Sequence, residues 1–135
     1  MIKLTIPGTP VSKARPRVTK RGAFTPQKTV NYESLVQYTY MDQAEGQKLE
    51  GPLKMDIGFY FPIPKSYSKK RKQAIMDIEE MHTKKPDIDN CIKSITDALN
   101  NFAYDDDSQI VEITAKKNYT VNEPNAVVTI FQIGG

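Results

Sequence analysis

The residues best suited to chemistry are acidic and lie close together in the second half of this 135-residue chain. Hard cations such as Mg²⁺ take oxygen ligands and often use only two or three protein carboxylates, which leaves positions for water and a substrate phosphate. Lys93, four residues after Asp89, would lie one helical turn away from such a site. Three aspartates gathered beside it would suit a metal-dependent reaction at a phosphate. The aspartates of this segment are Asp87, Asp89, Asp97, Asp105, Asp106 and Asp107.

The pattern around these aspartates predicts a helix that begins at Asp87 or Asp89, and a strand after it. Pro86 disfavours helical geometry at the preceding Lys85, so the chain enters extended and turns into the helix. Asp87 and Asp89 could then converge, one from the extended entry and one from the first turn. Asp107, just before the strand, could be carried back to the helix start if the two elements pack together. One apolar stripe along the helix is formed by Ile88, Cys91, Ile92, Ile95, Ala98, Leu99 and Phe102.

The spacing of these residues alone also allows purely structural roles for them. Asp87 could do no more than cap the helix. Asp89 and Lys93 could form an ordinary ion pair four residues apart, and the run 105–107 could be a solvated turn. An EF-hand is excluded, because a loop counted from Asp87 lacks the glycine at its sixth position and the glutamate at its twelfth.

Basic residues are segregated from these acids. The formal net charge is +3, yet no Asp or Glu occurs between Met1 and Tyr32, and a second basic cluster spans 65–72. Basic groups that hold phosphates, with carboxylates that hold a metal, suit an enzyme acting on a polyanion, although charge runs are often only solvated. Phe24 and Tyr67 could stack on unpaired bases or anchor their loops to the core. The candidate DNA-binding residues are Lys13, Arg15, Arg17, Lys20, Arg21, Lys69, Lys70, Arg71 and Lys72.

The remaining patterns predict a single α+β domain over residues 1–135, with a mixed sheet of about four strands packed with about three helices. Strands are expected at 2–6, 53–63, 109–119 and 125–133, and the basic segment 12–25 is expected to be a loop. Helices are expected at 26–46, at 66–81 or 68–81, and from 87 or 89 to 102. In the first of them, Val30, Leu35 and Tyr38 are expected to share one side.

Composition excludes several other kinds of site. One cysteine excludes an internal disulfide, and one Cys with one His cannot assemble a zinc ligand set. Cys91 lies on the apolar stripe and is expected to be buried and inert, whereas His82 has no partner in the pattern and is assigned no role. There is no apolar signal segment and no stretch near about 20 apolar residues. A cytoplasmic protein with no membrane partner is therefore expected.

Two separated groups of residues carry a family resemblance. The first is Lys85-Pro86-Asp87-Ile88-Asp89-Asn90 with Lys93, Asp97-Ala98-Leu99-Asn100 and Asp106-Asp107-Ser108-Gln109-Ile110, and the second is Pro10, Ser12-Lys13 and Arg15-Pro16-Arg17. Together they closely resemble the RusA family of Holliday junction resolvases. The resemblance implies metal-binding catalytic aspartates at Asp87, Asp89 and Asp107, with Asp106 in reserve for the third, and an essential lysine at Lys93.

The resemblance also implies a reaction and partners. The expected enzyme is a homodimer that cuts four-way junction DNA in recombination and repair. It is expected to use one or two Mg²⁺ ions per site, for which Mn²⁺ can substitute, and to leave DNA ends that can be ligated. The dimer interface would come from the helix carrying Tyr32, Tyr38 and Tyr40 or from an edge strand. Two rival functions are a DNA-binding protein without catalysis and a metal-dependent phosphoesterase acting on small nucleotides, which would not need two basic clusters. A phage, a prophage or a host origin is left open.

Overall fold

A computed structural model of the chain describes residues 1–14 and 17–134. Its four-stranded sheet consists of β1 (Ile2–Pro7), β4 (Leu53–Pro62), β5 (Ile110–Thr120) and β6 (Asn125–Gln132). Their order across the sheet is β1-β6-β4-β5; β4 and β5 run parallel, whereas the other two pairs are antiparallel. The mixed sheet and the α+β class predicted from the sequence are confirmed.

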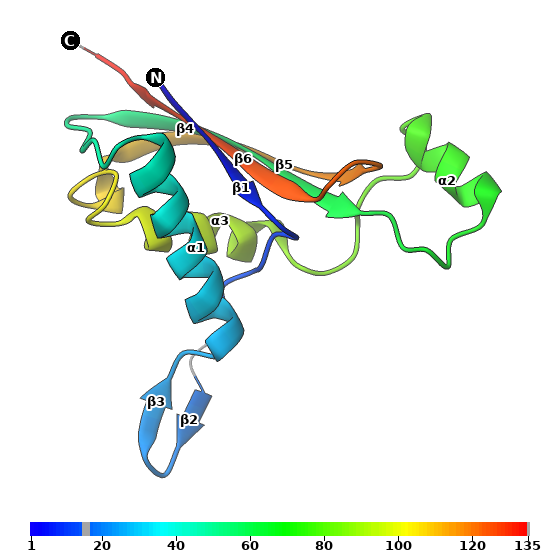
Figure 1. Cartoon of the computed structure of the whole chain (residues 1–135), viewed down its shortest axis with the longest axis horizontal. Helices are drawn as coiled ribbons and strands as arrows, with labels where there is room; N and C mark the ends of the chain where they lie inside the picture. The colour runs from blue at the N-terminus through cyan, green and yellow to red at the C-terminus, as the bar shows by residue number, and fades with distance from the viewer. Residues whose placement is uncertain (15–16, 135) are drawn as a thin grey trace.

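One face of the sheet carries the hydrophobic core. Every second residue of β4, from Leu53 to Phe61, is buried, as its strict alternation predicts. Helices α1 (Gln27–Gln43) and α3 (Ile88–Leu99) lie on this face and pack against each other (Figure 1). The core thus fixes α3, which carries Asp89 and Asp97 and begins directly after Asp87, relative to the sheet. Among the described residues, no helix has the length and apolar character needed to cross a membrane.

The buried face of α1 differs from the predicted one. Val30 is 39% exposed and Tyr38 71% exposed, so the predicted grouping of these two with Leu35 on one side is wrong. A helix buries residues three and four positions apart, and here two of the buried positions are threonines, so apolar spacing did not reveal them. The buried residues of α1 are Thr29, Tyr32, Val36, Thr39 and Tyr40.

The predicted loop 12–25 contains a small hairpin instead. Strands β2 (Arg17–Thr19) and β3 (Gly22–Phe24) pair antiparallel, separately from the main sheet, and project beyond the start of α1 (Figure 1). Gly22 adopts a φ of +112°, which glycine reaches without steric cost. The Thr19 hydroxyl donates to the Gly22 carbonyl at 3.2 Å and accepts from the Arg21 amide at 3.2 Å. Strands of three residues are too short for alternation to predict them.

Helix α2 (Lys69–Met76) projects from the sheet in a different direction (Figure 1). Ser68 caps it, accepting a hydrogen bond from the Arg71 amide at 3.2 Å, as one of the two predicted starts required. The helix ends at Met76 rather than at Met81, because the chain turns at Ile78, whose φ is +61°. None of the side chains of α2 is buried, so the helix makes no core contacts of its own and depends on the residues that flank it for its position.

Candidate metal and nuclease site

Asp87 occupies the N-cap position of α3, but its side chain does not cap the helix. Its backbone is extended, and its carbonyl accepts from the Cys91 amide at 3.1 Å, whereas its carboxylate makes no capping hydrogen bond. The nearest ammonium, that of Lys85, lies 4.0 Å away and is itself exposed. The simplest structural explanation of Asp87 therefore does not hold, and both of its carboxylate oxygens remain available to a ligand.

Asp89 follows in the first turn of α3 and is also exposed. The charges of Asp87 and Asp89 both act on the buried thiol of Cys91. Burial is the largest cause that raises the pKa of this thiol to about 11; the two carboxylates add to the rise and Lys117 opposes it. Both carboxylates therefore act on the first turn of α3, and their convergence on one metal ion stays a prediction.

Lys117 holds the approach to these acids in place. Its ammonium donates to the carbonyl oxygens of Lys84 at 2.7 Å and of Pro86 at 2.9 Å. Lys117 lies on β5 opposite Phe59, on the core side of the sheet. Hydrogen bonds from a charged group to carbonyls are among the stronger ones. No sequence pattern indicated this role, since Lys117 lies next to another lysine in an ordinary strand pattern.

Lys93 pairs with Asp97 and not with Asp89. The Oδ2 atom of Asp97 lies 3.5 Å from the Lys93 ammonium and 3.6 Å from that of Lys13. Lys13 also lies 2.8 Å from Glu33. Burial alone would lower the pKa of Lys13, but the two carboxylates outweigh it and raise the pKa. The Lys13 ammonium is therefore engaged within the protein, and a phosphate contact by it stays a prediction.

The three consecutive aspartates have separate environments. Asp105 lies 2.8 Å from Lys48 on the surface. Asp106 caps the short 3₁₀ helix η1 (Asp107–Gln109), together with the Gln109 side chain, and accepts from the Ser108 hydroxyl at 2.6 Å. That hydrogen bond is the largest cause that lowers the pKa of Asp106. Two of the three carboxylates thus already have structural partners.

Asp107 is the one of the three that faces α3. Its amide donates to Asn100 Oδ1 at 2.9 Å, which ties η1 to the end of that helix. Burial first, then a side-chain hydrogen bond with Asp106, and then the charges of Asp106 and Asp97 raise the pKa of its carboxyl, while Lys93 opposes the rise. Carboxylates that repel one another would be stabilised by a cation between them. This placement favours Asp107 over Asp106 as the third acid.

The structure brings the predicted acids together only in part. Over residues 1–14 and 17–134, no three His, Cys, Asp or Glu side chains form a group that could hold one metal ion. Asp107 lies near Lys93 and Asp97, one to two turns further along α3 than Asp89. A magnesium site does not require such a cage, because Mg²⁺ is usually held by one or two carboxylates together with water and substrate phosphates. The open carboxylates of Asp87 and Asp89 fit that requirement.

The predicted DNA-binding residues fall on the two projections. The turn of the β2–β3 hairpin exposes Lys20 and Arg21, and α2 exposes Lys69, Lys70 and Lys72. Arg71 is exposed as well but already has partners: its guanidinium lies 3.6 Å from the centre of the Tyr67 ring and donates to both carboxylate oxygens of Glu80, at 2.9 and 3.0 Å. Arg15 lies outside the described residues, as do the side chains of Arg17 and Phe24.

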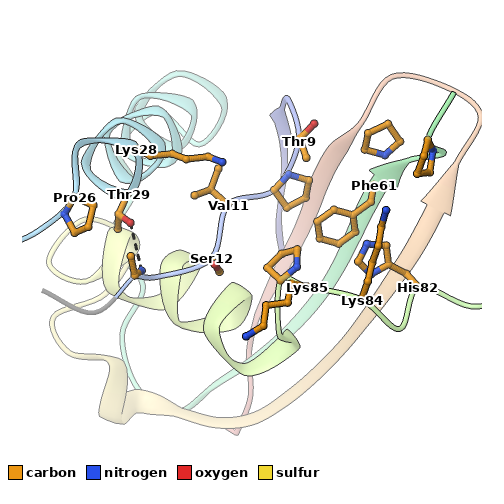
Figure 2. A pocket seen from close by; sticks show the side chains of 15 residues that line it. Thr9, Val11, Ser12, Pro26, Lys28, Thr29, Phe61, His82, Lys84 and Lys85 are labelled. Carbon is orange, nitrogen blue, oxygen red and sulfur yellow. Dashed lines mark hydrogen bonds between the residues drawn. The ribbon is translucent and has the colours of Figure 1, made fainter. Parts of the chain in front are cut away.

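A groove of about 640 Å³ adjoins the acids. Four segments line it, 9–14, 26–29, 61–64 and 82–86, and Figure 2 shows the N-terminal segment with Val11 and Ser12 running between Lys28 on α1 and Phe61 at the end of β4. Its last lining residues, Lys85 and Pro86, directly precede Asp87. We call it the lysine groove, because Lys28, Lys84 and Lys85 line it and no described Asp or Glu does.

His82 belongs to the wall of the lysine groove, a position that no sequence pattern indicated. It is 6% exposed and stacks on Phe61, with ring centres 4.2 Å apart and planes 20° from parallel. Its Nδ1 atom is buried without a hydrogen-bond partner among the described residues. Burial, followed by the charge of Lys117, lowers the pKa of His82, so the ring is neutral at physiological pH.

Comparison with known proteins identifies the family. A family model described as endodeoxyribonuclease RusA matches residues 7–131, a stretch that contains every acid considered above. YqaN of Bacillus subtilis (strain 168), an uncharacterized protein, is 36% identical over 138 aligned positions, which cover 98% of this chain and 96% of the relative. The chain therefore belongs to the RusA family of endodeoxyribonucleases.

Proposed function

We propose that this chain is a magnesium-dependent endonuclease that resolves four-way DNA junctions by paired, symmetric strand cuts, in recombination and repair. The observation that carries the proposal is that Asp87 lies at the N-cap of α3 without capping it, next to the equally exposed Asp89. Membership of the RusA family supports the reaction and the junction substrate. Two carboxylates at a helix start interact favourably with the helix dipole, and because neither makes a capping hydrogen bond they also suit a hard cation that binds a phosphate.

Each candidate residue has a distinct role in this reaction. Asp87 and Asp89 supply two carboxylates from the start of α3, and Asp107 supplies a third from η1. Mg²⁺, or Mn²⁺ in its place, contributes Lewis acidity at the scissile phosphate and makes water a stronger nucleophile. Lys93, 59% exposed on the same helix, stabilises the negative charge that develops on the phosphoryl oxygens or orients the attacking water. Asp97 holds the Lys93 side chain in position.

Phosphates away from the cut are held by the two basic projections. Lys20 and Arg21 on the hairpin form one contact region, and Lys69, Lys70 and Lys72 on α2 form the other. For Arg15 and Arg17 the same role is proposed from the sequence alone. The hairpin and α2 point away from the body of the molecule in different directions (Figure 1). Such an arrangement suits a branched substrate, because the arms of a junction also diverge. Contacts of this kind supply affinity without sequence preference.

The working unit is a homodimer. Resolution of a four-way junction requires two cuts in strands related by an approximate two-fold axis, and each chain offers one set of candidate acids. Two-fold dimers are the commonest oligomers, and such a pair would present two sites to strands of matching symmetry.

The decisive experiment is a cleavage assay on three DNAs with three additions. A four-way junction, a duplex and a single strand are each incubated with Mg²⁺, Ca²⁺ or EDTA. We expect paired cuts in the junction with Mg²⁺, binding without rapid cleavage in Ca²⁺, and no cleavage in EDTA. Binding to the junction with no cleavage under any addition would favour a non-catalytic DNA-binding protein. Efficient competition by a small phosphodiester would favour a phosphoesterase of small nucleotides.

A further inference from the structure

The lysine groove is joined rigidly to the start of α3. The Lys13 amide, between the lining residues Ser12 and Ala14, donates to the Asn90 carbonyl in the first turn of α3 at 2.9 Å. At the other end, Lys85 and Pro86 line the groove and continue directly into Asp87. A DNA strand whose phosphate lies at Asp87 therefore has its next nucleotide beside this groove.

The charge of the groove selects an anion. Lys28, Lys84 and Lys85 are all exposed. Lys84 lies 5.4 Å from the centre of the Tyr67 ring, and Lys85 has only the 4.0 Å pair with Asp87. Lys28 has no ion pair within the described part of the chain. With no carboxylate in the lining, a phosphate entering the groove meets only positive charge.

Between the lysines the lining is mainly apolar. Five prolines contribute to it, together with Val11 and the Phe61 ring stacked on His82. A bare phosphate would gain nothing from such a surface, whereas a nucleobase has a flat face that packs well on it. The volume of about 640 Å³ lies within the range of about 300 to 1,000 Å³ typical of small-molecule sites.

His82 adds a hydrogen-bonding group to this lining. Buried polar atoms in native proteins nearly always have a partner; the Nδ1 atom of His82 has none among the described residues and is closed off from solvent, so a ligand in the groove reaches it only if the ring turns. A neutral imidazole can donate or accept at the edge of a base. A base paired in a duplex has its edge occupied and both faces stacked, so only an unpaired base could use this group.

We propose that the lysine groove receives one unpaired nucleotide of the strand being cut, with its base against the apolar lining and His82 and its phosphate at the lysines. This inference rests on the proposed nuclease function and deepens it: the enzyme cuts where the junction opens a base pair next to the scissile phosphate. Selection for a branch point then follows from the unpairing energy, which is lower there than in an intact duplex.

The test uses four-way junctions that carry one 2-aminopurine at successive positions around the cut, mixed with the full chain in Ca²⁺. Unstacking of 2-aminopurine raises its fluorescence, and we expect a rise of about twofold or more at one position beside the scissile phosphate. Lys28→Gln with Lys84→Gln, and separately His82→Phe, should reduce that rise by at least half. His82→Phe keeps an aromatic ring that can stack on Phe61 and removes the nitrogens, with a somewhat larger ring. Lys3 is exposed on β1 and lies outside the groove, so Lys3→Gln is the matched control and should leave the fluorescence rise unchanged.

Each outcome decides the proposal. A flat fluorescence profile, or a rise that survives in both groove variants, overturns it, even if the junction is still cut with Mg²⁺ and the proposed function stands. If the wild-type chain does not cut the junction with Mg²⁺, but the fluorescence rise occurs and depends on the groove residues, only the nuclease function is refuted. If His82→Phe does not fold by circular dichroism, the lysine pair decides. A mismatch placed at the position of the rise should then speed wild-type cleavage several-fold and the lysine variant much less.

Discussion

Asp97 holds the Lys93 ammonium 3.5 Å from its Oδ2 atom, one helical turn further along α3. The same oxygen lies 3.6 Å from Lys13, which Glu33 binds more closely at 2.8 Å. Lys93 is thus oriented by a side chain that does not itself need to touch DNA. The pairs are partly exposed, so each contributes little to stability, about 1 kcal/mol or less.

Asp97→Asn should therefore lower kcat far more than it lowers stability. Misplacement of a catalytic group by about 1 Å can cost a hundredfold, and we expect a loss of roughly tenfold to a hundredfold in kcat with little change in KM. Single-turnover kinetics and thermal unfolding measure the two effects separately. Glu33→Gln is the matched control: it removes the closer partner of Lys13 but leaves Lys93 with Asp97, and kcat should change little. Equal losses in both variants would mean that Asp97 has only a structural role.

Substitution should separate the three candidate metal ligands from their neighbour Asp106. Asp87→Asn, Asp89→Asn and Asp107→Asn each remove a charge that a hard cation needs, and cleavage should fall by roughly a hundredfold or more. Junction binding in Ca²⁺ should persist, or tighten as repulsion of phosphates falls. Asp106→Asn is the matched control, because Asn caps a helix about as well as Asp, so η1 and activity should both survive. An inactive Asp106→Asn beside an active Asp107→Asn would move the third acid by one residue.

The lysines of α2, which have no ion pair among the described residues, and Arg71, which is paired with Glu80, should behave differently. Changing Lys69, Lys70 and Lys72 to Gln should weaken junction binding and lower the salt slope by about one unit for each phosphate that is no longer bound. Thermal stability should hardly change. Arg71→Gln should instead loosen α2, because it removes the packing on the Tyr67 ring and the two hydrogen bonds to Glu80. Filter binding at several salt concentrations, with hydrogen exchange over 65–82, separates the two. An unchanged salt slope in the triple variant would place the phosphate contacts elsewhere.

The elements that the sequence predicted well are those with a clear period. Residues 53–63 alternate and 88–102 repeat at three- and four-residue steps, so the buried side of each element could be predicted. In the second, Ile88 is nevertheless exposed and the helix ends at Leu99 rather than Phe102. The buried face of α1 was not, because Thr29 and Thr39 occupy it while Val30 points outward. The hairpin β2–β3 is held by a turn at Gly22 and by Thr19 rather than by any repeat.

The candidate site likewise has one part that the sequence predicted and one part that it did not. Asp87 and Asp89 are neighbours in sequence, so their proximity could be predicted from the turn into the helix. The position of Asp107 depends on a hydrogen bond to Asn100 and on the capping box at Asp106, which are tertiary and local details without a sequence period. The lysine groove draws on four distant segments, and His82 acquires its unpartnered nitrogen only through packing on Phe61. The spacing of residues along the chain therefore predicts neither the lysine groove nor the environment of His82.

Cys91 gives a test of the core beneath the acids. Its thiol is fully buried and its pKa is raised to about 11, so the protonated form is favoured at every pH below that value. At pH 8 only about one molecule in a thousand carries the reactive thiolate. We expect almost no alkylation by iodoacetamide in the native protein and rapid alkylation in denaturant, with reaction increasing as the pH rises toward 11. Mass spectrometry measures this, and fast native modification at pH 8 would contradict the packing of α3.

Burial narrows the choice of dimer interface. Tyr32 and Tyr40 are buried in the core of their own chain, so of the three tyrosines on α1 that could have formed an interface only Tyr38 remains exposed. An edge strand is the better candidate, and β5 is one of the two edges of the sheet. β5 pairs with β4 on one side only, runs over eleven residues and exposes Val111 and Ile113. Long apolar edges tend to be covered in native proteins.

We expect light scattering at micromolar concentration to give about twice the mass of one chain, and a supercoiled cruciform plasmid to be linearised by paired cuts. Val111→Glu should convert the dimer to a monomer that binds the junction but only nicks the plasmid, because a charge at the interface must be desolvated without a partner. Val121→Glu places the same charge at an equally exposed valine just beyond β5 and should leave the dimer intact. Dimers that survive Val111→Glu would place the interface away from this edge. A wild-type chain that is monomeric both free and on DNA, and that only nicks, would contradict paired cutting by two copies altogether.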